Sequence, residues 1–172
     1  GAMAPPGAGT LGPVRTGIHT TTMAFESPLV IDTHNHYWVI GRSDLYWLDD
    51  PSDPVLGKSY LPPDLKPQMD AVGVDGSLIV QAAHAWEDQL EYLELCEHYA
   101  YLGGAIAWVD LEDPDVGDQL DRLAGNRWYR GARAGAEDQA DPAWLTRADV
   151  RRGIRAATSR GHIVELLVKT PH

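Results

Sequence analysis

The sequence has one cysteine, Cys96, among 172 residues, and it has no uninterrupted apolar run of the about 18 residues that a membrane span requires. A single thiol cannot form an internal disulfide or a thiolate zinc site, so we expect a reducing, cytoplasmic setting. Cys96 lies in a helical pattern and is expected to fill space in the core. No glycine-rich phosphate loop follows the first predicted strand, which disfavours a dinucleotide-binding fold.

Basic residues are scarce in the middle of the chain. Residues 44–121 contain 18 Asp or Glu and 2 Lys, whereas residues 122–172 contain 10 Lys or Arg and 5 acidic residues, and the whole chain carries a formal charge of −11. An acidic chain without a basic stripe argues against nucleic acid and against anionic membrane surfaces as partners. The basic last third is either an ordinary solvated helix face or a surface suited to an acidic small molecule.

Residues 1–27 differ in composition from the rest of the chain and are expected to form a disordered leader. Residues 1–3, Gly-Ala-Met, look like the scar of a cleaved expression tag. Residues 4–22 are mainly Pro, Gly, Ala and Thr, and they lack the apolar core of a secretory signal. We expect residues 28–172 to form a single domain.

Strand and helix patterns alternate from residue 28 onward. Short apolar runs predict strands at residues 29–31, 77–81, 105–109, 129–133 and 163–168. Amphipathic spacing predicts helices at residues 64–72, 86–101, 113–123 and 142–160, the last with a break near Thr146. Because parallel neighbours need crossover connections, this alternation predicts a parallel sheet.

The predicted fold is α/β, an incomplete (β/α)8 TIM-type barrel with about five βα units. A complete barrel has eight strands and usually about 250 residues. Five strands would leave the edge of the fifth strand and one face of the sheet without partners. We therefore expect self-association or a complementary chain that supplies further strands, with residues 161–172 in or near the contact.

Polar side chains lie at the carboxyl end of each predicted strand, which is where (β/α) barrels have their active-site residues. His34 and His36 are candidate ligands of one divalent metal, with zinc expected, because alternate side chains point to the same side of a strand. A pair of surface or hydrogen-bonded histidines is the alternative. The candidate substrate-binding residues at the later strand ends and in the loop after the first strand are Gln81, His84, Asp110, Arg133, Trp38 and Trp47.

Two of these groups predict more specific behaviour. Trp38, Tyr46 and Trp47 either stack on the ring of a substrate or form an apolar cluster that closes the loop. Arg133 has a planar guanidinium that can hold a carboxylate in two hydrogen bonds. We expect Arg133→Lys to weaken binding of a carboxylate-bearing or polyhydroxy ligand and to change stability by no more than about 1 kcal/mol.

Residues 31–38, Ile-Asp-Thr-His-Asn-His-Tyr-Trp, resemble the opening signature of the amidohydrolase-related (amidohydrolase 2) family, in the branch of sugar lactonases and pyrone dicarboxylate lactonase. The resemblance covers residues 28–172, with further motifs in the expected order at residues 46–48, 60–65, 80–82, 108–111 and 131–133. It implies a distorted (β/α)8 barrel that hydrolyses a lactone or, in the decarboxylase branch, removes a carboxylate from an aromatic or unsaturated acid.

The resemblance also implies a metal site. In metal-using relatives the His-x-His pair binds one divalent ion, and a further His and a water-activating Asp come from later strands, whereas other relatives work without metal. Strands six to eight are not in this sequence, and Ala134 stands where relatives often have a His after Gly-x-Arg. His172 is a weak candidate for a further ligand. We therefore assign no catalytic residue within this chain.

Three hypotheses follow. The chain is part of a metal-assisted hydrolase of a lactone or similar cyclic ester, truncated or completed by a partner chain, with the decarboxylase branch as an alternative reaction. Otherwise it binds a small acidic ligand without turnover, or it is an assembly fragment whose sheet edge pairs with another chain.

Overall fold

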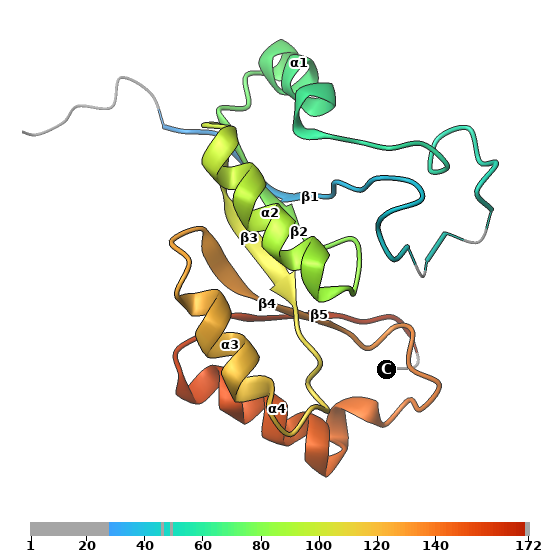
Figure 1. Cartoon of the computed structure of the whole chain (residues 1–172), viewed down its shortest axis with the longest axis vertical. Helices are drawn as coiled ribbons and strands as arrows, with labels where there is room; N and C mark the ends of the chain where they lie inside the picture. Colours follow the sequence, from blue (N-terminus) through green and yellow to red (C-terminus); the bar gives the residue numbers. More distant parts are fainter. Residues whose placement is uncertain (1–27, 46, 49, 171–172) are drawn as a thin grey trace, which may run out of the picture.

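The computed structural model describes residues 28–45, 47–48 and 50–170, so the predicted leader, Tyr46 and His172 lie outside the described residues. Its centre is a five-stranded parallel sheet in the order β1-β2-β3-β4-β5 (Figure 1). The strands are β1 (Ile31–Asn35), β2 (Gly76–Val80), β3 (Leu102–Trp108), β4 (Tyr129–Gly135) and β5 (Val164–Leu167). The predicted parallel sheet is confirmed.

One helix follows each of the first four strands and leads to the next one. These are α1 (Pro62–Val72), α2 (Trp86–His98), α3 (Val116–Ala124) and α4 (Ala148–Ser159), with a short 3-10 helix, η1 (Trp144–Thr146), at the predicted break before α4. Proline in the first turn of α1 is compatible with a helix start, and Gly73 ends this helix in the left-handed conformation, with φ of 73°. No described helix is long and apolar enough to cross a membrane.

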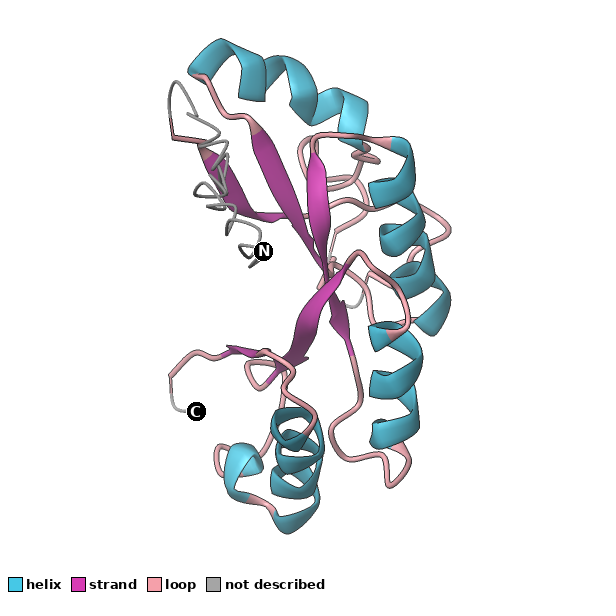
Figure 2. Cartoon of the chain, turned by 90° about the vertical axis from the view of Figure 1, so that its left-hand side faces the viewer, coloured by secondary structure: helices cyan, strands magenta, loops and turns pink. Residues whose placement is uncertain are grey.

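The helices lie along one side of the curved sheet, as Figure 2 shows. On this side Ala132, Ala134 and Ala136 of β4 and the segment after it belong to the buried core. Cys96 of α2 is also in this core and is 1% exposed, and burial raises the pKa of its thiol to about 11. The expectation that Cys96 fills space in the core is therefore confirmed. The described chain forms a half-barrel with its helices on the outside.

The two outer strands differ from the central ones in burial. Ile79 in β2 and Ala105 in β3 are fully buried, whereas Ile31 in β1 is 44% exposed and Leu166 in β5 is 39% exposed. Within the described part of the chain, β1 pairs only with β2, and β5 pairs only with β4. Each outer strand therefore presents one edge and apolar side chains that no described strand covers.

The first strand is longer than the sequence predicts. β1 continues past Asp32 to Asn35, through a shift in its register with β2, and the side chain of Asn35 donates a hydrogen bond to Ser77 Oγ at 2.7 Å. His34 thus lies within the strand instead of after it. The prediction failed because a strand with an exposed surface tolerates polar residues, so the end of an apolar run does not mark the end of the strand.

A close approach between α4 and the segment after β3 gives a test of this packing. A Cβ atom at Gly153 would lie 2.2 Å from the carbonyl oxygen of Leu111, so α4 would have to move. We expect Gly153→Ala to lower the free energy of unfolding by about 2 kcal/mol, although alanine is favoured over glycine in a helix by about 1 kcal/mol. Urea unfolding measures the change.

Gly117→Ala in α3 is the matched control. A Cβ there would meet only the end of the Arg160 side chain, which can move. We expect a change below about 1 kcal/mol for the control. Equal effects of the two substitutions would contradict the described packing of α4.

Candidate functional site

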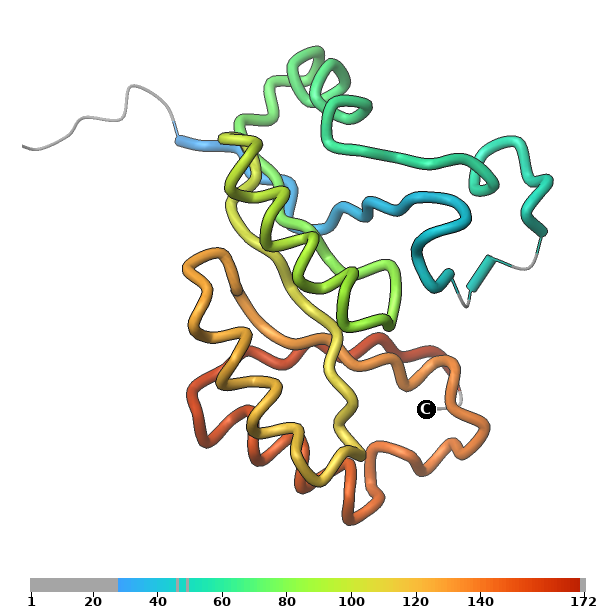
Figure 3. The backbone as a smooth tube through the Cα atoms, viewed as in Figure 1, coloured from blue at the N-terminus to red at the C-terminus, as the bar shows by residue number. Residues whose placement is uncertain are grey.

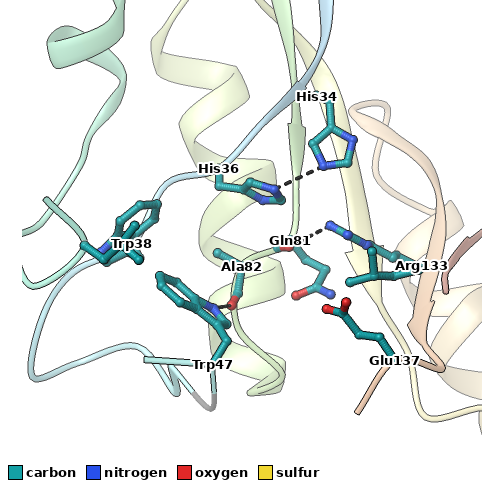
Figure 4. Close-up of a pocket in the computed structure, with 10 residues that line it drawn as sticks. His34, His36, Trp38, Trp47, Gln81, Ala82, Arg133 and Glu137 are labelled. Atoms are coloured by element: carbon teal, nitrogen blue, oxygen red, sulfur yellow. Dashed lines mark hydrogen bonds between the residues drawn. The ribbon is translucent and has the colours of Figure 1, made fainter. Parts of the chain in front are cut away.

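A cavity of about 460 Å³ lies at the carboxyl end of the sheet (Figure 4). Figure 3 shows that the connections leaving β1 and β4 extend from this same end. Six of the predicted site residues line the cavity together: His34, His36, Trp38, Trp47, Gln81 and Arg133. The other lining residues were not among the predicted site residues, and they are Leu56, Ala82, Glu137 and Leu167.

The imidazole rings of His34 and His36 face each other in the wall of the cavity. His34 Nε2 and His36 Nε2 form a hydrogen bond at 3.1 Å, which is the hydrogen-bonded pair that the sequence left open as the alternative to a metal site, and His36 Nδ1 forms a hydrogen bond with the backbone carbonyl oxygen of Val80 at 2.9 Å. A carbonyl oxygen only accepts, so Nδ1 of His36 carries the proton and Nε2 presents a lone pair. Burial, with help from the nearby His34 and Arg133, lowers the pKa of His36. The lowered pKa favours the neutral form of the His36 ring, and the Val80 hydrogen bond favours the tautomer that suits a metal ligand.

The distance between the histidines also fits a shared ion. Two nitrogens that each bind a tetrahedral zinc at about 2.0–2.1 Å are separated by about 3.3 Å, close to the observed 3.1 Å. However, the described residues contain no group of three or more His, Cys, Asp or Glu side chains that could hold an ion. They supply two ligands, whereas a catalytic zinc usually takes three from protein. The fit is therefore partial.

Arg133 is not a free guanidinium at the mouth of the barrel. Arg133 is only 4% exposed. Its Nε atom lies 3.2 Å from Glu165 Oε1, and its Nη1 atom lies 3.5 Å from the backbone carbonyl oxygen of Gln81. Arg133 and Glu165 are register partners on β4 and β5, so their ion pair links the two strands. The expectation that Arg133→Lys changes stability by no more than about 1 kcal/mol is at odds with this ion pair, in which Arg133 is buried and Glu165 is half-buried.

Two acidic residues near Arg133 were missed from the sequence. Glu165 interrupts an apolar strand directly opposite Arg133, and this interruption was a usable signal. Glu137 follows β4 by two residues and reaches the cavity from the loop. Loop side chains have no strand periodicity that predicts their direction, so only the structure identifies Glu137 as a lining residue.

The tryptophans form the loop-closing cluster that the sequence offered as one of two roles, and stacking on a substrate ring stays a prediction. The rings of Trp38 and Trp47 meet edge to face, with centroids 5.2 Å apart, and Trp47 Nε1 donates a hydrogen bond to Ala82 O at 2.6 Å. Trp38 also pairs through its backbone with Tyr60, which closes the long loop. The cluster therefore closes the loop and forms one wall of the cavity.

His84 and Asp110 do not line this cavity with the other candidates. Both line a separate, smaller hollow, where the His84 ring stacks on Trp108 with centroids 5.0 Å apart, and burial is the main cause of the lowered pKa of His84. Asp110 Oδ1 accepts a hydrogen bond from the Glu112 backbone at 2.9 Å and so organises the turn after β3. Both residues lie beyond their strands, where the direction of the loop decides the direction of the side chain.

Comparison with known proteins agrees with this half-barrel geometry. Residues 31–171 match the amidohydrolase family. The chain is 28% identical over 142 residues to an L-fucono-1,5-lactonase from Burkholderia ambifaria, which covers 83% of this chain and 49% of the relative.

Two solved structures are similar as well. An amidohydrolase from Burkholderia multivorans with bound zinc superimposes with a TM-score of 0.72 at 31% identity, covering 82% of this chain and 49% of the other. A probable 2-pyrone-4,6-dicarboxylic acid hydrolase from Acinetobacter baumannii, with citric acid bound, gives 0.60 at 20% identity, covering 80% and 48%, and shares the fold.

A parallel half-barrel with polar side chains at its carboxyl end defines the class, a partial (β/α) barrel of the kind found in hydrolases. The chain belongs to the amidohydrolase family. It spans about half the length of the relatives it matches.

The ion pair between Arg133 and Glu165 gives a second test. We expect Arg133→Lys to lower the free energy of unfolding by about 1–3 kcal/mol, because lysine lacks the planar fork and leaves a buried site imperfectly paired. A double-mutant cycle with Glu165→Gln, measured by urea unfolding, should give a coupling of about 1 kcal/mol. A coupling near zero would mean that Arg133 does not stabilise the β4–β5 pairing.

Proposed function

We propose that the cavity belongs to a metal-assisted lactone hydrolase and that the described residues form the part of its site that positions the substrate. The facing Nε2 atoms of His34 and His36, 3.1 Å apart beside Arg133 and Gln81, are the observation that carries the proposal. The lactonase activity in the name of the relative supports it. The reaction adds water to the carbonyl carbon and breaks the ring carbon–oxygen bond, which leaves a hydroxy acid.

Each group has a role in this proposal. His34 and His36 would hold a divalent ion, zinc by analogy with the similar structure, and that ion would polarise the lactone carbonyl. The Val80 carbonyl holds the His36 ring in its orientation. Trp38 and Trp47 offer an apolar wall to the carbon face of a sugar ring.

The site needs groups that the described half-barrel lacks. A third protein ligand and a carboxylate that takes a proton from the attacking water would come from further βα units beside β5 and β1. In this proposal a longer chain or a partner chain would supply these units. For the 172 residues alone, we expect weak binding of zinc, detectable binding of the lactone, and little or no hydrolysis of it.

Binding of L-fucono-1,5-lactone tests the proposed function. Trp38 and Trp47 line the cavity, so stopped-flow tryptophan fluorescence can follow the freshly dissolved lactone before it hydrolyses spontaneously. We expect the lactone to change the fluorescence, zinc to tighten its binding about tenfold, and His36→Ala to abolish the effect of zinc.

His98→Ala is the matched control, because His98 lies on the exposed side of α2. It should keep the effect of zinc on lactone binding. The proposal fails if the lactone produces no change or if zinc acts equally on His36→Ala. Rapid hydrolysis by the chain alone that persists after metal removal would contradict the two-ligand account.

The uncovered edge of β5 predicts self-association. We expect sedimentation velocity to show dimers or larger species, since exposed strand edges pair readily with other chains. Leu166→Lys, which places a charge on this edge, should shift the distribution towards monomer. Val72→Lys, on an apolar residue of α1 that is 74% exposed, should not. A compact, stable wild-type monomer would refute the prediction.

A further inference from the structure

Gln81, directly after β2, has a fixed backbone and a buried side-chain oxygen without a partner. Its backbone nitrogen donates to the carbonyl oxygen of Ile106 at 3.0 Å, and its own backbone carbonyl oxygen lies 3.5 Å from Nη1 of Arg133. The residue is 2% exposed, and no described group hydrogen-bonds its Oε1 atom. Burial of an amide oxygen without a partner destabilises a folded chain. The packing of the described chain therefore gives no reason for an amide at this position.

The same side chain lines the main cavity. Figure 4 shows the amide of Gln81 directed into the space between Trp47 and Glu137. A half-turn about the last torsion of the side chain exchanges Oε1 with Nε2, so the amide can present either an acceptor or a donor to a ligand. A hydroxyl group both donates and accepts hydrogen bonds, and it can therefore pair with either end of the amide.

The cavity around this amide has an apolar side and a polar side. The rings of Trp38 and Trp47 form the apolar side, and the hydrogen bond from Trp47 Nε1 to Ala82 O holds one of them in place. On the polar side, the guanidinium of Arg133 is already paired with Glu165. A ring with carbon–hydrogen groups on one face and hydroxyl groups at its edge matches both sides of such a cavity.

We propose that Gln81 is a specificity-determining residue whose amide hydrogen-bonds a hydroxyl group of the substrate, so that the site prefers a hydroxylated lactone to the same ring without hydroxyl groups. This inference rests on the proposed function and narrows its substrate class. A site that holds a polar group for a substrate hydroxyl rejects an analogue without the hydroxyl, because the buried group then stays unpaired. The amide and both kinds of lactone are neutral, so this preference does not depend on the balance of charges in the cavity.

Two lactones with the same kind of ring test the inference. L-fucono-1,5-lactone carries hydroxyl groups, whereas δ-valerolactone carries none. We expect Gln81→Met, which keeps the length of the side chain and removes the amide, to weaken binding of the fuconolactone about five- to tenfold. Binding of δ-valerolactone should be unchanged or tighter, because this lactone leaves the wild-type amide unpaired. Stopped-flow tryptophan fluorescence measures both affinities, with each variant compared with wild type at the same zinc content.

Gln68→Met is the matched control, since Gln68 is exposed on α1 and does not line the main cavity. It should leave the binding of both lactones unchanged. Urea unfolding without a ligand gives a second readout. We expect Gln81→Met to unfold at an equal or higher urea concentration than wild type, because the variant no longer buries an unpaired amide oxygen.

The outcomes separate this inference from the function on which it rests. Equal weakening of both lactones by Gln81→Met, or weakening of neither, overturns the role of Gln81 and leaves the lactone site standing. A lower urea midpoint for Gln81→Met overturns it as well, because the amide would then stabilise the free chain. Failure of wild type to bind either lactone, with or without zinc, overturns the proposed function and the inference with it.

Discussion

Parallel pairing of consecutive strands is the constraint on which the rest of this structure depends. Each strand must return to the same end of the sheet before it can pair in parallel, so a crossover helix lies between every two strands. All four crossovers lie on one side, and the apolar side chains of the central strands pack against them. The opposite side and the carboxyl end remain for polar residues, which is where the cavity forms.

The positions of the site residues follow from the alternation of side chains between the two faces of the sheet. In β4 the alanines at 132 and 134 point to the helices, so Arg133 between them points to the other side and meets Glu165 of β5. In β1, Asn35 contacts Ser77, and its neighbours His34 and His36 line the cavity. The histidine pair at β1 and the Arg133 side chain of β4 thus line one cavity, although their strands are not neighbours in the sheet. The carboxylate of Glu137 is added to this cavity from the loop after β4.

The periodic part of this architecture was readable from the sequence. Apolar runs identified five strands, and the His-x-His spacing placed two rings on one side of a strand, because both depend on local repeats. The predicted end of β1 was wrong, because a partly exposed strand accepts polar residues such as His34. The grouping of the site was partly wrong, because His84, Asp110 and Glu137 lie beyond strand ends, and loop directions depend on contacts distant in sequence. Glu165 was missed, although its place opposite Arg133 gave a signal.

We propose that the described half-barrel contributes two imidazoles, those of His34 and His36, to a metal site at its carboxyl end, since its described residues contain no group of three or more side chains that could hold an ion. X-ray absorption spectroscopy of the zinc-loaded chain counts the ligands directly, because imidazole rings give characteristic outer-shell scattering. The account predicts two imidazoles with solvent oxygen in the remaining positions, and one imidazole in His34→Ala. A zinc ion bound by three or more protein side chains, or an unchanged spectrum in His34→Ala, would contradict it.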